Sequence, residues 1–217
     1  MKLSLRLQTI ADLIPPNHSL GDIGSDHGYL IQEVIEKNKV PFAYACDNKK
    51  GPYERLKANL SRYSNVSVSL SSGLDKLPTN IETVSITGMG GELVSSILND
   101  GKEKLKNVSY LVLGPQGNVN DVRKTINELG FKIDNEKLVF EDHYYTILVC
   151  SRGHVDYEDI DYEFGPILRN NQDELFIKMY HEELDLINRL LDNPQINETK
   201  KDLLKSRASL INSVIKA

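Results

Sequence analysis

The stretch "SLGDIGSDHGYL", residues 19–30, carries the signals that decide the fold. Its first half reads as a short strand ending in a glycine turn, and the "YLIQEVIEKN" that begins within it has the apolar spacing of a helix. Glycines at such a junction let a ligand approach the backbone, and the helix start offers free N–H groups. The stretch therefore predicts a ligand-binding strand–turn–helix unit, with the unusual feature that Asp26 and His27 stand inside the turn.

The chain around this stretch alternates helices with short apolar strands. A first helix is expected over residues 4–14, with Ser4 as its N-cap and Pro15 and Pro16 closing it. Further strands are expected over 18–24, 42–47, 66–70, 83–88 and 110–114, and helices over 28–38, 50–62, 91–99 and 118–129. Two strand-like runs, 131–141 and 143–153, then follow without a helix between them. This order predicts an α/β fold with a doubly wound, mostly parallel seven-stranded sheet whose last strand is reversed.

The pattern changes after about residue 165. The segment 172–193 places apolar residues three and four apart, Pro194 interrupts it, and a second stripe runs from Leu203 to Ile215. Two such helices predict a C-terminal αα-hairpin packed in coiled-coil fashion. We expect two domains, 1–163 and 164–217. Fold-level reasoning leaves open whether the hairpin is a structural cap over the sheet edge or an arm that positions a substrate.

Composition narrows the class of protein. The chain has 217 residues, of which 40% are hydrophobic and 26% charged, as in ordinary globular proteins, and its net charge of −5 argues against indiscriminate coating of nucleic acid. No apolar run approaches the roughly 18–20 residues of a membrane span, and the N-terminus lacks a signal-peptide pattern, so we expect a cytoplasmic protein. Cys46 and Cys150 form no CxxC pair, and we expect both to be buried and no metal site to be present.

The charge of the glycine turn predicts the ligand. Asp22, Gly24 and Gly28 follow the first strand, and Asp26 lies between the two glycines. A carboxylate there would repel a pyrophosphate but would suit a ligand with an ammonium group and a cationic sulfur, which favours S-adenosylmethionine over NAD. Asp47 follows the second strand, where an acidic residue can accept both ribose hydroxyls. The loops 24–28, 47–52, 71–74 and 88–91 all fall at strand ends, where such sheets bind ligands.

Several segments together resemble one family of enzymes. They are "LSLRLQTIADLI" (3–14), "DIGSDHGYL" (22–30), "ACDNKKGP" (45–52), "SITGMGGELV" (85–94), "LVLGPQGN" (111–118), "YYTILV" (144–149) and "FGPIL" (164–168). They are similar to the bacterial tRNA (adenine-22-N1)-methyltransferases, and the resemblance covers the whole sheet domain. It implies a class I (Rossmann-like) methyltransferase fold, S-adenosylmethionine as the methyl donor, and methylation of N1 of adenine-22 in the D-arm region of tRNA.

The pattern and the resemblance together imply a cofactor site. We expect the cofactor to contact Asp22, Gly24, Ser25, Asp26, Gly28, Tyr29, Asp47, Asn48, Ser72, Gly73, Leu74, Gly88 and Met89. Ser72 stands where such families usually carry an acidic residue. A hydroxyl holds the exocyclic amine of the cofactor's adenine less strongly than a carboxylate does, which predicts weaker cofactor binding.

Catalysis requires an extruded base aligned with the methyl group and stabilisation of a cationic product. We expect Asp26, His27 and Gln116 to act in this step. Asp26 would stabilise the developing charge, and Gln116 would bond to the adenine edge. His27 would orient Asp26 or contact the substrate, the alternative being a structural residue at the helix start. The expected substrate-binding residues are Arg6, Tyr29, Gly90, Gly91 and Gln116, with Arg6 reaching the cofactor's carboxylate or a phosphate.

Two other functions remain open from the sequence. One is a methyltransferase acting on another RNA, on a protein or on a small molecule. The other is a non-enzymatic NAD-binding regulator that dimerises through the hairpin, although Asp26 in the phosphate loop speaks against it. The oligomeric state is not encoded in any motif, and we favour a monomer.

Overall fold

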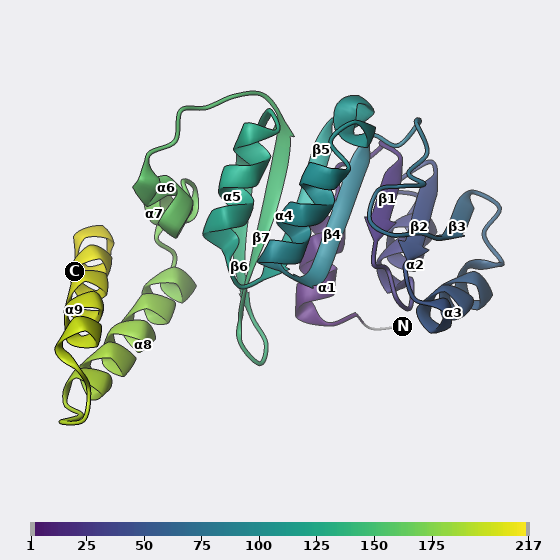
Figure 1. Cartoon of the computed structure of the whole chain (residues 1–217). Coiled ribbons are helices and arrows are strands. Elements are labelled where there is room, and N and C mark those ends of the chain that lie inside the picture. The colour runs from purple at the N-terminus through teal and green to yellow at the C-terminus, as the bar shows by residue number, and fades with distance from the viewer. Residues whose placement is uncertain (1–2, 216–217) are drawn as a thin grey trace.

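The computed structural model, described here for residues 3–215, is built on one sheet of seven strands. Its order is β3-β2-β1-β4-β5-β7-β6 (Figure 1). The strands are β1 (Leu20–Ile23), β2 (Ala43–Asp47), β3 (Val66–Leu70), β4 (Thr83–Gly90), β5 (Tyr110–Gln116), β6 (Phe131–Phe140) and β7 (Tyr144–Arg152). Neighbouring strands pair in parallel except at β7, which is antiparallel to both β5 and β6. The predicted doubly wound sheet with a reversed last strand is confirmed.

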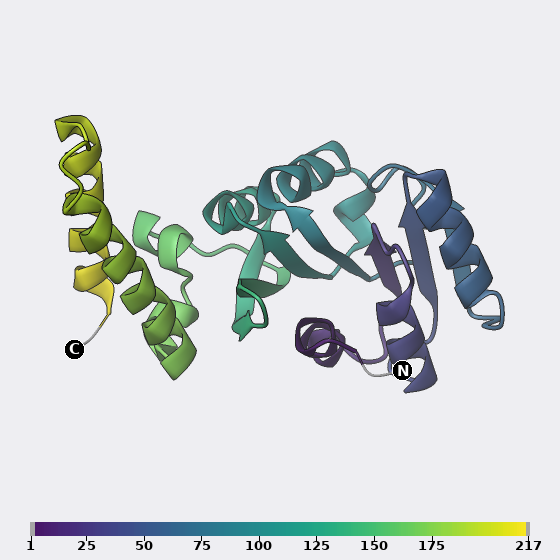
Figure 2. The ribbon, with the colours of Figure 1, turned by 90° about the horizontal axis from the view of Figure 1, so that it is seen from below.

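Helices cover both faces of the sheet. On one face lie α4 (Gly91–Asp100), α5 (Val119–Glu128) and the short 3₁₀ helix η1 (Lys104–Asn107), and on the other lie α1 (Leu5–Leu13), α2 (Tyr29–Glu36) and α3 (Lys50–Leu60) (Figure 2). The central strands are apolar on both sides. Leu111 and Leu113 pack under α4 and α5, while Val112 between them packs under α1 and α2. Burial on both faces explains why these strands read as continuous apolar runs.

Local chemistry sets the helix starts that border the cleft. The Ser4 hydroxyl accepts a hydrogen bond from the Leu7 N–H, 3.3 Å away, as predicted for an N-cap. Gly28 is the N-cap of α2 and has a left-handed backbone, φ 73°. Along the sheet, the chain runs outward from β1 to β3 and then returns to place β4 on the other side of β1. This reversal puts a crevice at the carboxyl ends of β1 and β4.

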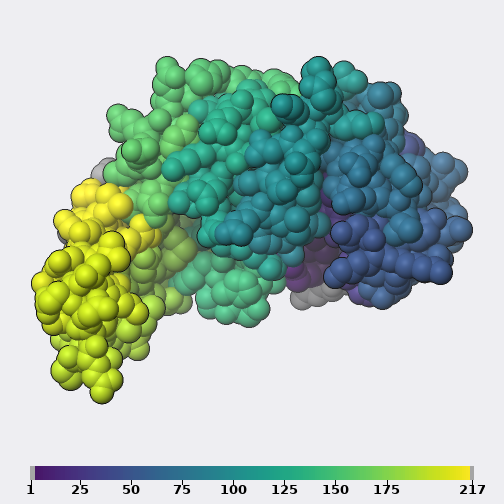
Figure 3. Space-filling model, viewed as in Figure 1, coloured from purple at the N-terminus to yellow at the C-terminus, as the bar shows by residue number. Residues whose placement is uncertain are grey.

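The C-terminal part packs against the outer strand β6. It consists of α6 (Asp159–Phe164), α7 (Leu168–Asn171), α8 (Glu174–Leu191) and α9 (Glu198–Val214). Phe164, Phe176 and Ile211 form a cluster that also takes in Leu138 of β6, so the hairpin lies directly against the sheet domain (Figure 3). The hairpin is where the sequence predicts it, whereas α6 and α7 were not predicted. The predicted boundary between 163 and 164 falls at the end of α6.

A buried ion pair ties the segment between the two parts to the sheet. Arg123 of α5 and Glu136 of β6 are 3% and 0% exposed, with 2.8 Å between Nε and Oε1. Glu136 Oε2 also accepts from the Ile167 N–H, and Arg123 Nη1 donates to the Tyr162 carbonyl. The pair thus joins α5 and β6 to the segment from Tyr162 to Ile167, and we name Arg123 and Glu136 the clasp.

Within residues 3–215, no helix combines the length and the apolar character needed to cross a membrane. Cys46 and Cys150 are both buried and free, as predicted.

Candidate active-site cleft

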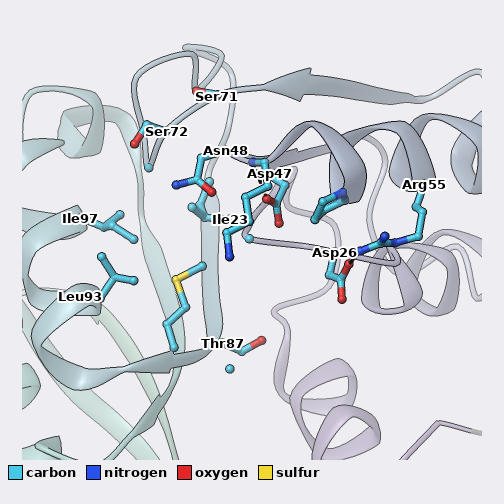
Figure 4. Close-up of a pocket in the computed structure, with 16 residues that line it drawn as sticks. Ile23, Asp26, Asp47, Asn48, Arg55, Ser71, Ser72, Thr87, Leu93 and Ile97 are labelled. Carbon is cyan, nitrogen blue, oxygen red and sulfur yellow. Dashed lines mark hydrogen bonds and ion pairs between the residues drawn. The ribbon is translucent and has the colours of Figure 1, made fainter.

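A cavity of about 610 Å³ lies at the carboxyl ends of β1 to β4, within the range typical of ligand sites (Figure 4). We name it the Asp47 cavity. All four loops that the sequence singled out contribute to its wall, through Gly24 and Asp26, Asp47 and Asn48, Ser72 and Gly73, and Gly88 and Met89. Leu93 and Ile97 of α4 form the side opposite Asp26 and Arg55 (Figure 4). The cavity therefore has an apolar wall and a polar wall, which suits a flat ring carrying a polar tail.

Gly24 lets Met89 pack directly against the backbone at the floor of the cavity. Its φ is +74°, and a Cβ built there would lie 1.9 Å from the Met89 Cε, closer than any real contact. Met89 follows an irregularity in β4, where the pairing register with β5 shifts between Thr87 and Met89. The positive φ favours glycine at this position, and a side chain there would force the flexible end of Met89 to move.

Asp22 lies at the end of β1 with 4% of its surface exposed. The Ser85 hydroxyl donates to its Oδ1 at 2.5 Å. Burial raises the pKa of the Asp22 carboxyl, and the hydroxyls of Ser25 and Ser85 oppose that rise. A carboxylate held in this way is destabilised as an anion and would gain from a cationic partner.

Asp26 does not stand alone in the turn. Arg55 of α3 donates from Nη2 to its Oδ1 at 2.7 Å, and the His27 Nε2 is 3.5 Å from Oδ2. About half of the Asp26 and Arg55 side chains is exposed, so solvent screens the pair. The His27 ring stacks on Tyr29, with centroids 5.1 Å apart and planes 9° from parallel. Arg55 was not predicted as a site residue, because its only signal in the sequence is its place on the helix that follows the Asp47 loop.

Asp47 and Ser72, both predicted to bind the cofactor, line the Asp47 cavity where β2 and β3 end. The Asp47 carboxylate accepts from the Lys49 N–H at 2.9 Å, which fixes its orientation at the end of β2. Ser72 is exposed on the rim beside Gly73. Leu74 was also expected at the cofactor, but it is 2% exposed, packs in the core and does not line the cavity. The turn after β3 exposes Ser72 and buries both Ser71 and this leucine.

A second cavity of about 300 Å³ adjoins the first. We name it the Arg6 cavity. It shares Gly24, Asp26, Thr87 and Gly88 with the Asp47 cavity, so the two are parts of one cleft. Its other walls bring together residues from distant segments, namely Arg6, Asp22, Ser25, His27, Tyr29 and Gln116.

Arg6 has unused hydrogen-bonding capacity. Its Nε and Nη1 are shielded from solvent and have no hydrogen-bond partner among residues 3–215. The guanidinium lies over the Tyr145 ring, 4.5 Å from its centroid, and the backbone N–H of Arg6 donates to Glu141 Oε1. Buried donors without acceptors are costly, so this arrangement indicates an anionic group of a ligand as the missing partner.

Gly90 and Gly91 were expected to contact a substrate, but neither lines the two cavities. A Cβ on Gly91 would lie 2.5 Å from the Gly117 carbonyl oxygen. The glycine lets the start of α4 pack against the loop between β5 and α5, and this packing accounts for it without a ligand. Three residues that were not predicted also line the cleft, because nothing in the sequence distinguishes them from core residues. They are Thr87, Leu93 and Ile97.

Comparisons with known proteins agree on one family. A family model described as tRNA (adenine(22)-N(1))-methyltransferase matches residues 20–216. The tRNA (adenine(22)-N(1))-methyltransferase of Bacillus subtilis (strain 168) is 31% identical over 233 aligned positions, covering 99% of this chain and 98% of the relative.

Solved structures are similar along the whole chain. A putative tRNA (m1A22) methyltransferase of Streptococcus pneumoniae, in complex with S-adenosyl-L-methionine, superposes with a TM-score of 0.91 at 28% identity, covering 99% of this chain and 100% of that one. A structure from M. capricolum in complex with S-adenosyl-homocysteine gives 0.87 at 27% identity, covering 98% and 97%.

Proposed function

The chain belongs to the tRNA (adenine(22)-N(1))-methyltransferase family, and from this premise we propose that it transfers the methyl group of S-adenosylmethionine to N1 of adenine-22 in tRNA. The observation that carries the proposal is the cleft formed by the Asp47 cavity and the Arg6 cavity, where the strand order reverses between β1 and β4. The Asp47 cavity has the polarity for a nucleoside, and the adjoining Arg6 cavity has ionic groups for a charged tail and further walls for a second ring.

The residues of the Asp47 cavity fit this cofactor. The Asp47 carboxylate would accept hydrogen bonds from the ribose hydroxyls, while Leu93 and Ile97 would pack on the adenine ring with Ser72 at its edge. Gly24 lines this cavity without a side chain, so the chain between ribose and amino acid could pass close to its backbone. When bound, S-adenosylmethionine supplies a methyl group activated by a sulfonium.

Two ionic groups fit the charged tail of the cofactor. Arg6 has the unpaired donors that a carboxylate requires, and Asp22 is a buried carboxylate that would gain from a neighbouring ammonium group. Both line the Arg6 cavity. An NAD-binding regulator is disfavoured because a pyrophosphate in the turn after β1 would lie against the carboxylates of Asp22 and Asp26.

The remaining walls of the Arg6 cavity suit the target adenine. The Gln116 amide would bond to the polar edge of the base, and the stacked rings of His27 and Tyr29 would provide a flat surface for it. An adenine must leave its stack to enter, and the narrow cleft would then exclude water and align N1 with the methyl group. The Asp26 carboxylate would stabilise the cationic product, and the positive charge of Arg55 would partly offset this stabilisation.

We propose that the enzyme works as a monomer in the cytoplasm, where tRNA is available. The direct test is transfer of labelled methyl from S-adenosylmethionine to unmodified bulk tRNA, followed by nucleoside analysis. We expect label in 1-methyladenosine, and its loss in a transcript whose adenine-22 is replaced by guanine. Label in another nucleoside, or equal label in the replaced transcript, would contradict the proposal.

A separate binding test addresses the cofactor alone. Saturation with S-adenosylhomocysteine at 100 times its dissociation constant should stabilise the protein by about 2.7 kcal/mol. NAD at the same concentration is expected to leave the melting temperature unchanged. A larger shift with NAD would instead support the regulator.

A further inference from the structure

A third cavity, of about 330 Å³, lies where the sheet domain meets the C-terminal helices. We name it the hairpin cavity. One side is formed by the end of β5 and the start of α5, and the opposite side by α6, α8 and α9. No residue expected to bind the cofactor or the target base lines it. Its volume is at the lower end of the range for small-ligand sites.

The hairpin cavity adjoins the site proposed for the target adenine. Pro115 and Gly117 line the hairpin cavity, while Gln116 between them lines the Arg6 cavity. Pro115 and Gln116 are successive residues of β5 and face opposite sides of it, so this short segment divides the two cavities. The backbone from Pro115 to Gly117 spans at most about 7 Å. Two neighbouring groups of one ligand can therefore occupy both cavities at once.

The floor of the hairpin cavity is aromatic. Phe164 and Tyr180 are 1% and 6% exposed, and their ring centroids are 5.1 Å apart. Met179 adds a polarisable side chain at the wall. Tyr144 is anchored at the rim because its hydroxyl donates to Glu182 Oε2 at 2.8 Å. Such a surface favours a flat, partly apolar group.

The charged residues of the cavity argue against a phosphate. Among the described residues that line it, the cations are Arg123 and Arg207. Arg123 is held by Glu136 in the clasp. Arg207 is held by Glu163 at 2.5 Å and by Glu183 at 2.6 Å. Both guanidiniums are therefore already neutralised by carboxylates, whereas Asn118 and Asn120 supply uncharged polar groups. A neutral ring with a polar edge matches this set.

We propose that the hairpin cavity binds the nucleobase of the tRNA nucleotide adjacent to the target adenine, an inference that rests on the proposed function. Extruding one base removes a stacking partner from its neighbour, and specific RNA recognition commonly places such unstacked bases on aromatic side chains. Binding of the adjacent base in the hairpin cavity would hold the extruded adenine in place in the Arg6 cavity. It would also give the hairpin a direct part in substrate binding.

The protein side of the test fills the cavity. Thr146 lies on β7, half-buried, with its side chain in the cavity wall. Thr146→Phe should occupy the space of the base, and Thr146→Val is the matched control because it keeps the β-branched shape. We expect Thr146→Phe to weaken tRNA binding roughly tenfold or more, the size of a lost base–aromatic stack. Thr146→Val should bind tRNA like the wild type, and both variants should keep the wild-type affinity for S-adenosylhomocysteine.

The RNA side of the test uses the wild-type enzyme, so it holds even where a variant fails to fold. Two transcripts carry an abasic nucleotide directly before or directly after the target adenine. One of them should bind wild type roughly tenfold more weakly. The same transcript should lose little further affinity with Thr146→Phe, because the variant has already displaced that base.

Three results would each overturn the inference. The first is that both abasic transcripts bind wild type as tightly as the intact transcript does. The second is a Thr146→Phe defect that adds in full to the abasic defect. The third is a Thr146→Phe variant that still binds S-adenosylhomocysteine and shows no defect in tRNA binding. Each is distinct from failure of the proposed function, in which wild type would leave adenine-22 of the intact transcript unmethylated.

Discussion

The buried carboxyl of Asp22 lowers the folding stability of the ligand-free protein but would favour the binding of a cationic group. Its carboxyl is 4% exposed, and burial raises its pKa above the ordinary value of 3.8. The folded state then binds a proton more tightly than the unfolded state, so this group lowers stability as the pH rises from about 4 through the raised pKa. A cost of this kind at the floor of a cleft is typical of a group that serves a ligand.

Asp22→Asn is therefore expected to raise the melting temperature of the ligand-free protein at neutral pH. The Ser85 hydroxyl can still donate to the amide oxygen, so packing is retained. The gain over wild type should be larger at pH 7.5 than at pH 4.5, and the affinity for S-adenosylhomocysteine should fall. Thermal unfolding at both pH values measures this, with the exposed Asp75→Asn as control. Equal differences at the two pH values would contradict the assignment.

Asp26 is the residue whose role depends most on charge. Asp26→Asn is expected to lower the single-turnover methylation rate by roughly 10²-fold at saturating cofactor and tRNA, with cofactor affinity nearly kept. Arg55→Gln is the matched control, because it removes the ion pair but leaves the carboxylate. Its rate should stay within about threefold of wild type.

Two outcomes would change this picture. An Asp26→Asn rate within about threefold of wild type would remove the catalytic role, since that factor is well under 1.4 kcal/mol. A fall with Arg55→Gln as deep as with Asp26→Asn would assign the effect to the ion pair.

At the scale of elements, the clasp decides how the C-terminal part is attached. Glu136→Leu leaves the Arg123 charge buried without a partner and the Ile167 N–H without an acceptor. We expect it to lower the free energy of unfolding by about 3–5 kcal/mol. The double variant Arg123→Met, Glu136→Gln removes both charges and keeps an acceptor, so it should recover most of that loss. Denaturant unfolding measures both, and a double variant as unstable as Glu136→Leu would contradict the explanation.

Elements with a strong apolar period were predictable, and those held by polar contacts were not. The central strands could be read from the sequence because both faces are buried, as at Leu111 and Val112. The helix α6 was missed because it is six residues long and starts in an acidic stretch, where Glu158 and Asp161 cap each other's backbone. Glu136 carried no signal of burial, since a glutamate in a half-exposed strand ordinarily faces water.

The site was likewise predictable in its location but not in its polar contacts. Glycines and acidic residues at strand ends located the cleft, because parallel strands bring their carboxyl ends to one edge. The partner of Asp26 could not be found in this way, since Arg55 approaches from a helix 29 residues later in the chain. The burial of Leu74 could not be foreseen for a related reason: a turn sequence does not say which of its residues points inward.

At the scale of the whole molecule, the hairpin separates two kinds of binding. Ending the chain at Asn171 removes Met179, Tyr180 and Arg207 from the hairpin cavity but leaves the Asp47 cavity intact. We expect the affinity for S-adenosylhomocysteine to stay within about threefold and tRNA methylation to fall roughly tenfold or more. Phe164 becomes exposed, so monodispersity must be checked first. A soluble truncation with full activity would leave the hairpin with a structural role only.

The pairing of β1 with β4 also has a consequence during synthesis. Leu20 lies beside Thr83, and about 60 residues separate the end of β1 from the start of β4. A ribosome adds roughly 5–20 residues per second, so the growing chain waits about 3–12 s between these two strands. During that interval β1, β2 and β3 can pair, but one edge of β1 stays open and Met89 has not yet been made. The nascent protein must therefore protect a bare strand edge for seconds before its cleft can exist.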